Sequence, residues 1–237
     1  MDDFWIATGD SPEEVKRHIQ AIHDFLDACE AHSYFLKPSK CQIMQPKMTL
    51  LGWEVTAEGL RIDPDKVAGI AKWPRILKSV KEVRQALGVL GYQRPFIKGF
   101  AHLARPLTEL TKKDVPFSWT NLRERALDHL IKQVTEKAIL AYPDFSKQFE
   151  LEVDASAFAV GAILFQRTEE GKKRDVAYYS HALNPAERNY DVWDREFLAI
   201  VKALKKWRPL LIGTNHKIII WTDHSNLQYY HQPQKVN

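Results

Sequence analysis

The chain has 237 residues and a net charge of +4, with 45% hydrophobic and 27% charged residues, which excludes a disordered, collagen-like or coiled-coil protein. Its two cysteines, Cys29 and Cys41, form no CxxC pair and are too few for a disulfide scaffold, so a reducing compartment is favoured. No apolar run reaches the roughly 18 residues that a membrane span needs, so we expect an intracellular protein with no membrane partner.

The first segment, residues 1–59, is acidic and is predicted to combine one helix with short strands. It carries 5 basic and 10 acidic side chains. An apolar, strand-like run covers residues 4–7, and residues 10–14 have the cap, the proline and the acidic first turn of a helix start. Apolar residues then follow at helical spacing up to Cys29. Two further short strands are predicted at residues 41–44 and 49–56, with a turn between them.

The second segment is basic and helical. Residues 60–114 carry 12 basic and 5 acidic side chains. One helix is predicted from Asp63 to Lys72, a second behind the capping box at residues 79–82, a third over 102–110 and a fourth over 122–139. The charge fits either a solvated face or a surface that follows a polyanion, because a local positive field attracts phosphates.

The third segment begins near residue 148 and has the pattern of a mixed sheet. Strands are predicted at 149–154, 160–165 and 175–180, and a helix at 189–211. A fourth strand at 217–223 is almost wholly apolar, which predicts burial on both of its faces. Ser225 is expected to cap a short final helix.

Three carboxylates of this segment stand where chemistry is plausible. Asp154 and Asp223 each end an apolar strand, and Glu196 lies in the helix between those strands. If the two strands are neighbours, the three side chains converge, and clustered carboxylates repel unless cations share them. Hard oxygen ligands without His or Cys favour Mg²⁺ or Mn²⁺, and two such ions would cleave a phosphodiester. The alternative is that each acid caps a turn or faces solvent.

The motifs of the whole chain together resemble those of gypsy-type retrotransposon Pol polyproteins. The run from Glu150 to Ser156, Arg195–Val201 and Trp221–His224 resemble a retrotransposon ribonuclease H domain, in that family's order. The helical middle resembles the thumb and connection of gypsy-type reverse transcriptases, with motifs at Leu51-Gly52, Ile62–Val67, Trp73-Pro74, Leu87-Gly88, Phe96-Ile97 and Arg105–Thr108. Met1-Asp2-Asp3 resembles the end of the polymerase palm motif.

This resemblance implies an α+β chain in three parts. They are a palm remnant with thumb at 1–59, a basic helical connection at 60–147, and a β-β-β-α-β-α ribonuclease H-like domain at 148–237 without the family's C-terminal elements. Asp154, Glu196 and Asp223 match the family's metal carboxylates, and two Mg²⁺ or Mn²⁺ ions are expected in each active site. Asp2 and Asp3 match the paired palm aspartates, of which the first binds metal in the family.

The resemblance also implies partners and a substrate. Leu51-Gly52-Trp53 lies where the family has its primer grip, a hairpin that holds the growing DNA end. RNA–DNA hybrid, RNA template and DNA primer are expected to contact this grip, the basic segment and the residue after Asp223. The residues are Leu51, Gly52, Trp53, Lys72, Arg75, Lys78, Lys81, Arg84, Arg94, Lys98 and His224. The missing polymerase parts would come from the parent polyprotein or from a partner chain. The expected location is the cytoplasm, in a retroelement particle, or the nucleus.

The expected function is that of a fragment of a reverse transcriptase and ribonuclease H. The parent activity would be RNA-directed DNA synthesis with metal-dependent hydrolysis of RNA in hybrids. The family's upstream catalytic aspartate is not in this chain, so polymerase activity is not expected from it. A fourth acidic ligand of the family's ribonuclease H is also absent. The alternative is a non-catalytic remnant that binds nucleic acid or only folds.

Overall fold

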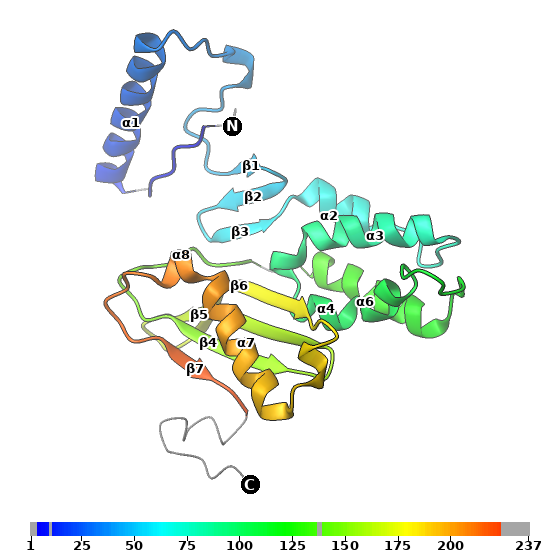
Figure 1. Ribbon diagram of the computed structural model, residues 1–237. Coiled ribbons are helices and arrows are strands. Elements are labelled where there is room, and N and C mark those ends of the chain that lie inside the picture. The colour runs from blue at the N-terminus through cyan, green and yellow to red at the C-terminus, as the bar shows by residue number, and fades with distance from the viewer. Residues whose placement is uncertain (1–3, 10, 137–138, 224–237) are drawn as a thin grey trace. The chain divides into compact units, whose positions relative to one another are not determined.

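A computed structural model describes residues 4–9, 11–136 and 139–223, and the chain divides into two compact units, Met1–Met48 and Thr49–Asn237 (Figure 1). The first unit contains helix α1 (Pro12–Ala31) and the 3₁₀ turn η1 (Pro38–Lys40). Ser11 caps α1 as the sequence predicts, its Oγ accepting from the backbone N–H of Glu14 at 3.3 Å. Among the hydrophobic residues of α1, only Cys29 is buried.

Two of the predicted strands in the first unit are wrong. Residues 4–7 and 41–44 have no strand structure. A strand needs a hydrogen-bonded neighbour for its backbone groups, and residues 4–9 and 11–47 contain no strand that could pair with either segment. An apolar run alone therefore did not suffice to predict a strand.

A three-stranded antiparallel hairpin sheet follows, made of β1 (Met48–Leu50), β2 (Trp53–Thr56) and β3 (Gly59–Ile62). The single strand predicted at 49–56 is instead two strands, β1 and β2, broken at Leu51 and Gly52. Both residues have positive φ, 49° and 79°, as a two-residue hairpin turn requires. Leu51 is 66% exposed in this unfavourable conformation.

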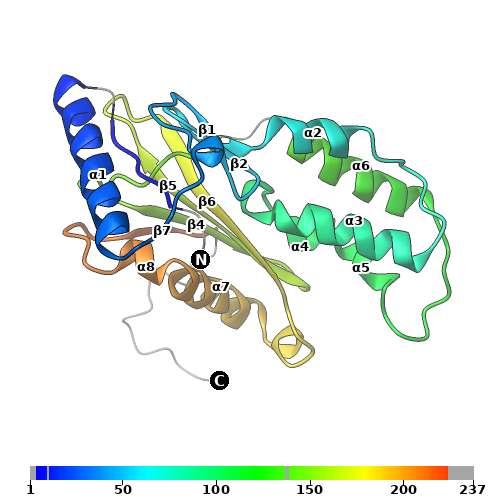
Figure 2. The same cartoon turned by 90° about the horizontal axis from the view of Figure 1, so that it is seen from above.

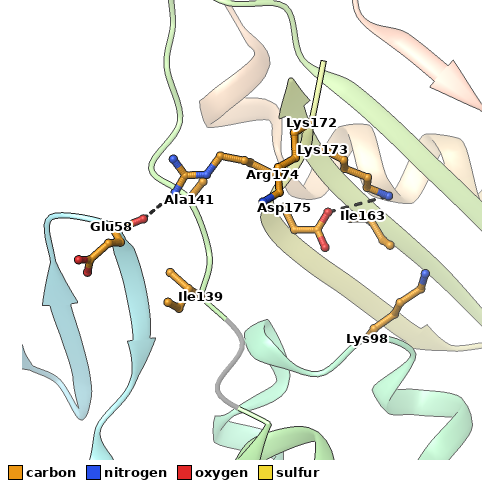
Figure 3. A pocket seen from close by; sticks show the side chains of 9 residues that line it. All are labelled: Glu58, Lys98, Ile139, Ala141, Ile163, Lys172, Lys173, Arg174 and Asp175. Atoms are coloured by element: carbon orange, nitrogen blue, oxygen red, sulfur yellow. Dashed lines mark hydrogen bonds and ion pairs between the residues drawn. The ribbon is translucent and has the colours of Figure 1, made fainter. Parts of the chain in front are cut away.

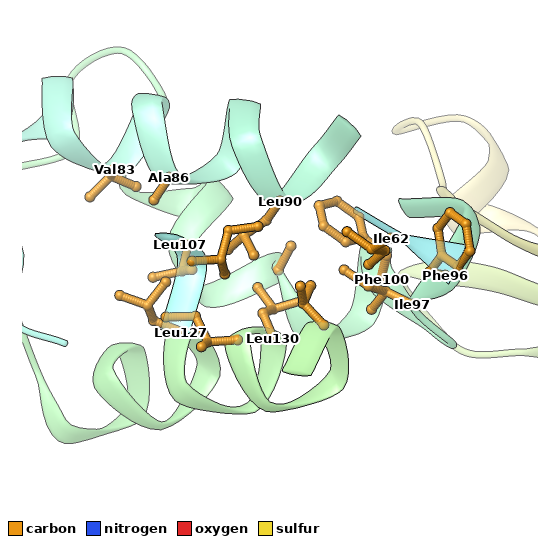
Figure 4. Close-up of a cluster of buried hydrophobic side chains, with 14 of the residues drawn as sticks. Ile62, Val83, Ala86, Leu90, Phe96, Ile97, Phe100, Leu107, Leu127 and Leu130 are labelled. Carbon is orange, nitrogen blue, oxygen red and sulfur yellow. The ribbon is translucent and has the colours of Figure 1, made fainter. Parts of the chain in front are cut away.

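Helices α2 (Pro64–Ala71), α3 (Val80–Tyr92), α4 (Phe100–Leu103), α5 (Arg105–Glu109) and α6 (Asn121–Thr135), with the 3₁₀ turn η2 (Arg94–Phe96), form the helical region. Its core is mostly aliphatic, with Phe96 and Phe100 at one end, and draws on α3, α5 and α6 as well as on Ile62 of β3 (Figure 4). Val83, Leu107, Leu110 and Leu127 are each 0% exposed. The caps predicted at Asp63 and Ser79 are confirmed.

Two predicted helix bounds in this region need correction. The helix expected over 102–110 is two short helices, α4 and α5, which meet at Ala104. Pro106 lacks an N–H and its ring would clash with the carbonyl of His102 in a continuous helix, so the helix restarts. The helix expected to reach residue 139 ends at Thr135, and Leu140 instead pairs with Leu60 of β3.

The C-terminal sheet has the order β6-β5-β4-β7. Strands β4 (Glu150–Ala155), β5 (Ala159–Arg167) and β6 (Lys173–Ala182) are antiparallel, and β7 (Ile219–Trp221) runs parallel to β4. Helices α7 (Val192–Lys206) and α8 (Arg208–Leu211), preceded by the 3₁₀ turn η3 (Glu187–Asn189), cover one face of this sheet (Figure 2). The predicted α+β class is confirmed, as is the order β-β-β-α-β along the chain within the described residues.

The helix predicted over 189–211 and the fourth strand also differ from expectation. Pro209 separates α7 from α8 at Trp207 for the same reason that Pro106 separates α4 from α5. Strand β7 is an edge strand only three residues long, with Ile219 36% and Trp221 50% exposed, so burial on both faces is wrong. The helix expected after Ser225 lies outside the described residues.

The helical region and the C-terminal sheet pack against each other. The backbone N–H of Ala101 donates to Ser180 Oγ on β6 at 2.9 Å. The guanidinium of Arg105 lies 3.2 Å from the ring centroid of Phe158, in the turn between β4 and β5. A cation over an aromatic face is attractive, so this contact fixes the turn that follows Asp154.

Candidate active site

Two of the predicted site carboxylates lie at the same edge of the sheet. Strands β4 and β7 are parallel neighbours, with Glu152 opposite Trp221. Asp154 lies near the carboxyl end of β4, and Asp223 follows the end of β7 by two residues; both are exposed. The predicted neighbour relation between the two strands is therefore confirmed, and it brings these acids to the edge where α/β sites form.

The third carboxylate comes from the helix that covers the sheet. Glu196 lies in α7 on its buried face, in line with Ala199 and Ala203, whose small side chains let the helix approach the sheet closely. It is only 3% exposed, and its Oε1 accepts from the backbone N–H of Ala155 at 3.1 Å. This bond ties α7 to the end of the strand that carries Asp154.

The electrostatics of Glu196 connect the three acids. The pKa of the Glu196 carboxyl is raised to about 7, mainly by burial; the Ala155 N–H acts against this by stabilising the charged form, and the Asp223 and Asp154 carboxylates add to the rise. Like charges raise a carboxyl pKa only when they are near, so the three side chains form one electrostatic group. Perturbed pKa values of this kind concentrate at functional sites.

Glu196 also offers a free ligand atom. Its Oε2 is buried and makes no hydrogen bond. A buried carboxylate oxygen without a donor is costly, and the exposed Asp154 and Asp223 supply further hard oxygen atoms of the kind that Mg²⁺ and Mn²⁺ prefer. The donor types thus fit such an ion. However, within residues 4–9, 11–136 and 139–223 no three His, Cys, Asp or Glu side chains stand close enough to hold one.

A buried carboxylate that sequence reasoning missed supports this edge. Glu150, 5% exposed at the start of β4, accepts from Arg167 Nε at 2.7 Å and from Trp221 Nε1 at 2.6 Å. The indole bond attaches the short strand β7 to β4 just before Asp223. The sequence signal for Glu150 was its alternation with Glu152 and Asp154, which places three acids on one face of β4. A carboxylate buried on a sheet face needs a hydrogen-bond or ion-pair partner.

The hairpin residues proposed as a primer grip are contacted by Tyr92 at the end of α3. The Tyr92 hydroxyl donates to the carbonyl of Leu51, and the ring of Trp53 lies 5.9 Å from the ring of Tyr92. Lys66 lies over the same tyrosine ring at 5.0 Å, and a Cβ on Gly52 would fall 1.9 Å from its ammonium. Exposed Leu51 is thus fixed in an unfavourable backbone conformation, a feature common at functional sites.

The predicted basic contacts are dispersed over the helical region. Arg75 is half-buried and donates to Asp128 at 2.9 Å, and Arg84 donates to the carbonyl of Thr111. Six of the predicted basic residues, Arg84 among them, have exposed side chains: Lys72, Lys78, Lys81, Arg84, Arg94 and Lys98. The guanidinium of Arg94 lies over the ring of Phe100. Asp2, Asp3 and His224 lie outside the described residues. No helix in the described part of the chain combines the length and apolarity of a membrane span.

Comparisons with known proteins agree with this architecture. The family described as an RNase H-like domain found in reverse transcriptase matches residues 119–220. The Tf2-3 and Tf2-7 transposon polyproteins of Schizosaccharomyces pombe are each 35% identical to the chain over 227 residues, which is 96% of this chain but 17% of the polyprotein. The chain therefore spans about a sixth of the length of these relatives.

Solved structures of foamy viral protease-reverse transcriptase share the fold. One, described as dRH in complex with double-stranded DNA, has a TM-score of 0.77 and 20% identity, over 95% of this chain and 39% of that one. Another, in complex with RNA/DNA hybrid, has a TM-score of 0.73 and 20% identity, over 92% and 30%. The expected relationship is confirmed at this level: the chain is similar to transposon polyproteins over nearly its whole length, and its residues 119–220 match the RNase H-like domain found in reverse transcriptase.

Proposed function

We propose that the C-terminal sheet of this chain hydrolyses the RNA strand of RNA–DNA hybrids with divalent metal ions. The observation that carries the proposal is the buried carboxyl of Glu196, which has an unpartnered Oε2 and a pKa raised mainly by burial, with smaller contributions from the Asp223 and Asp154 carboxylates. Carboxylate oxygens from two strand ends and one helix are hard ligands of the kind that Mg²⁺ or Mn²⁺ prefers, although these three described side chains do not stand close enough to hold an ion in this structure. This site would act inside the cell, in a retroelement particle or in the nucleus.

Each residue has a distinct part in this proposal. Asp154 and Asp223, both exposed, would hold metal from the two strand ends, and Glu196 would add its unpartnered Oε2 from the helix. When bound, the ions would activate water and stabilise the leaving oxygen of the phosphodiester. The Ala155 N–H holds Oε1 of Glu196 in place, so the helix carboxylate stays aimed at the strand ends.

The remaining parts of the chain would hold the nucleic acid. In the proposed three-part organisation, residues 1–59 end the palm and provide the grip, 60–147 form the connection, and 148–237 cleave. The exposed cations between Lys72 and Lys98 would lie along hybrid or template–primer, with affinity that falls steeply with salt. Two structural neighbours are complexes with double-stranded DNA and with RNA/DNA hybrid, which supports nucleic acid as the partner.

The test is cleavage of an end-labelled RNA–DNA hybrid by the purified chain in Mg²⁺ and in Mn²⁺. We expect cleavage that EDTA stops and that Asp154→Asn and Asp223→Asn each reduce to background. Glu170→Gln is the matched control, since Glu170 is an exposed acid of the same sheet in the turn between β5 and β6. Cleavage that survives both aspartate substitutions would contradict the proposal. Metal-independent hybrid binding without cleavage would favour the non-catalytic alternative.

A further inference from the structure

A cavity of about 450 Å³ lies where the hairpin sheet, the segment before β4 and the C-terminal sheet meet (Figure 3). Ile163 contributes to its lining and alternates with Ala162 and Leu164, whose side chains pack in the core beneath α7. The cavity therefore faces away from α7 and from Glu196. The lining residues are Glu58, Lys98, Ile139, Ala141, Ile163, Lys172, Lys173, Arg174 and Asp175.

Hydrogen bonds between distant segments hold the walls of this cavity in place. Arg174 Nη2 donates to the carbonyl of Glu58 in the hairpin turn at 2.7 Å. The backbone N–H of Ala141 donates to the carbonyl of Asp175 at 2.8 Å. The hairpin, the connecting segment and β6 are thus linked around the opening, and a site formed in this way needs little reorganisation to bind a ligand.

The lining carries more positive than negative charge. Lys98, Lys172, Lys173 and Arg174 face two carboxylates, those of Glu58 and Asp175. Just outside the lining, one carboxylate serves two ammonium groups, since Glu152 accepts from Lys173 and lies 3.5 Å from Lys98 Nζ. The cationic groups therefore retain capacity for a further anion, and phosphate is the anion that Arg and Lys recognise best together.

One acceptor in the cavity lacks a donor. Asp175 Oδ2 accepts from the Tyr178 hydroxyl at 2.6 Å, whereas Asp175 Oδ1 is buried and makes no hydrogen bond. Lys173 Nζ forms an ion pair with this oxygen at 3.9 Å, a distance too long for a hydrogen bond (Figure 3). A buried carboxylate oxygen gains from a hydroxyl donor, so the cavity offers an acceptor beside a group of cations.

We propose that this cavity binds a ribonucleotide, with its phosphate on Lys98, Lys173 and Arg174 and a ribose hydroxyl on Asp175 Oδ1. Cations and a lone acceptor side by side match the phosphate and hydroxyl of a ribose phosphate. The volume falls in the range of small-molecule sites, about 300–1,000 Å³. The nucleotide is either a unit of an RNA strand or free, and both present the same groups.

The test is a binding titration of the purified chain in EDTA, with adenosine monophosphate, its 2′,3′-dideoxy analogue and inorganic phosphate as probes. We expect the monophosphate to bind about tenfold more tightly than either other probe, since a hydrogen bond to a charged group is worth about that factor. Asp175→Asn should reduce the preference for the hydroxyl, because a neutral amide oxygen accepts a hydrogen bond less strongly than a carboxylate does, and Lys98→Met should weaken binding of both nucleotides about tenfold. Lys206→Met, an exposed lysine on α7, is the matched control.

Competition by a short RNA strand distinguishes a nucleotide within RNA from a free nucleotide. In either case, a lower affinity of the Asp175→Asn variant for adenosine monophosphate supports the site. Thermal unfolding of each variant checks that the fold is kept. The proposal is overturned if the monophosphate does not bind, if inorganic phosphate binds as tightly, or if both variants bind like the parent chain. Hybrid cleavage is not the readout, so failure here leaves the proposed ribonuclease activity standing.

Discussion

At the scale of single residues, the candidate site combines exposed acids with one buried acid. Asp154 and Asp223 remain in solvent, where a carboxylate costs no desolvation, whereas Glu196 lies on the buried face of α7 at 3% exposure. Its only described hydrogen bond comes from Ala155, and one oxygen remains unpartnered. A group that reduces stability yet lies at a strand edge beside other acids is typical of function rather than of folding.

This burial predicts how the metal-free protein responds to pH. The carboxyl of Glu196 has its pKa raised from 4.5 to about 7 in the folded state, so the folded protein binds the proton more tightly than the unfolded chain does. The contribution of this group to stability is highest below pH 4.5, falls as the pH rises towards 7, and stays low above it. The full difference is at most about 3 kcal/mol.

Glu196→Gln is therefore expected to stabilise the metal-free protein at pH 8, by about 1–2 kcal/mol, because it removes a buried charge and keeps the acceptor for Ala155. Thermal unfolding in EDTA at pH 5 and pH 8 measures this, and the gain should shrink at pH 5. Glu187→Gln is the control of opposite sign. Its carboxylate is bonded to Lys202 at 2.7 Å, which lowers its pKa, so neutralising it should cost stability at pH 8. A Glu196→Gln protein that melts lower at pH 8 would contradict the reasoning.

At the scale of elements, the short strand β7 depends on side-chain bonds more than the other strands do. Within the described residues it pairs only with β4, over three residues, and Ile219 and Trp221 are 36% and 50% exposed. Glu150 compensates by accepting from the Trp221 indole, while Arg167 neutralises the buried carboxylate. Because Asp223 follows two residues later, the position of that acid relies on this bond.

Trp221→Phe is expected to loosen β7, because it removes the indole N–H and keeps an aromatic ring. We expect a loss of about 1–2 kcal/mol, with faster hydrogen exchange of the β7 amides than of those in β5. Trp193→Phe is the matched control, since the Trp193 Nε1 is buried without a hydrogen-bond partner and its loss should cost less. Equal exchange rates in β7 of both variants would show that the Glu150 bond does not hold the strand.

The elements also show which features were readable from the sequence. Helix caps at Ser11, Asp63 and Ser79 involve neighbours within four residues, so a local pattern predicts them. The breaks at Pro106 and Pro209 were equally local, but apolar periodicity continued across both prolines and gave one long helix each time. Where periodicity and a proline disagree, the steric restriction of the proline ring prevails.

At the scale of the whole molecule, what escaped prediction depends on distant contacts. The placement of Asp154 beside Asp223 was predictable because parallel strands align their ends, but no local pattern indicates that Arg105 lies over Phe158. The cavity around Asp175 likewise needs the hairpin turn at Glu58, more than a hundred residues away. Each partner in a long-range contact of this kind is a single residue, and the sequence around it has no regular spacing that would predict the contact.

The two compact units also differ in how much core each has. All buried hydrophobic clusters lie between Trp53 and Ile220, whereas Cys29 is the one buried hydrophobic residue described before residue 49. Phe35 is 96% and Phe4 68% exposed. Burial of apolar surface is the main favourable term in folding, so the second unit is expected to fold on its own and the first to contribute little to its stability.

Deletion of residues 1–48 is therefore expected to leave the melting temperature of the remaining chain unchanged within about 2 °C. Differential scanning calorimetry of both proteins measures this, and limited proteolysis of the full chain should cut first within those 48 residues. A longer deletion, of residues 1–62, is the control. It removes Ile62 from the helical core and Leu60 from its paired hydrogen bonds with Leu140, so melting should fall by several degrees. If the shorter deletion lowers melting as much as the longer one, the second unit needs the first, and its own two cores do not suffice to fold it.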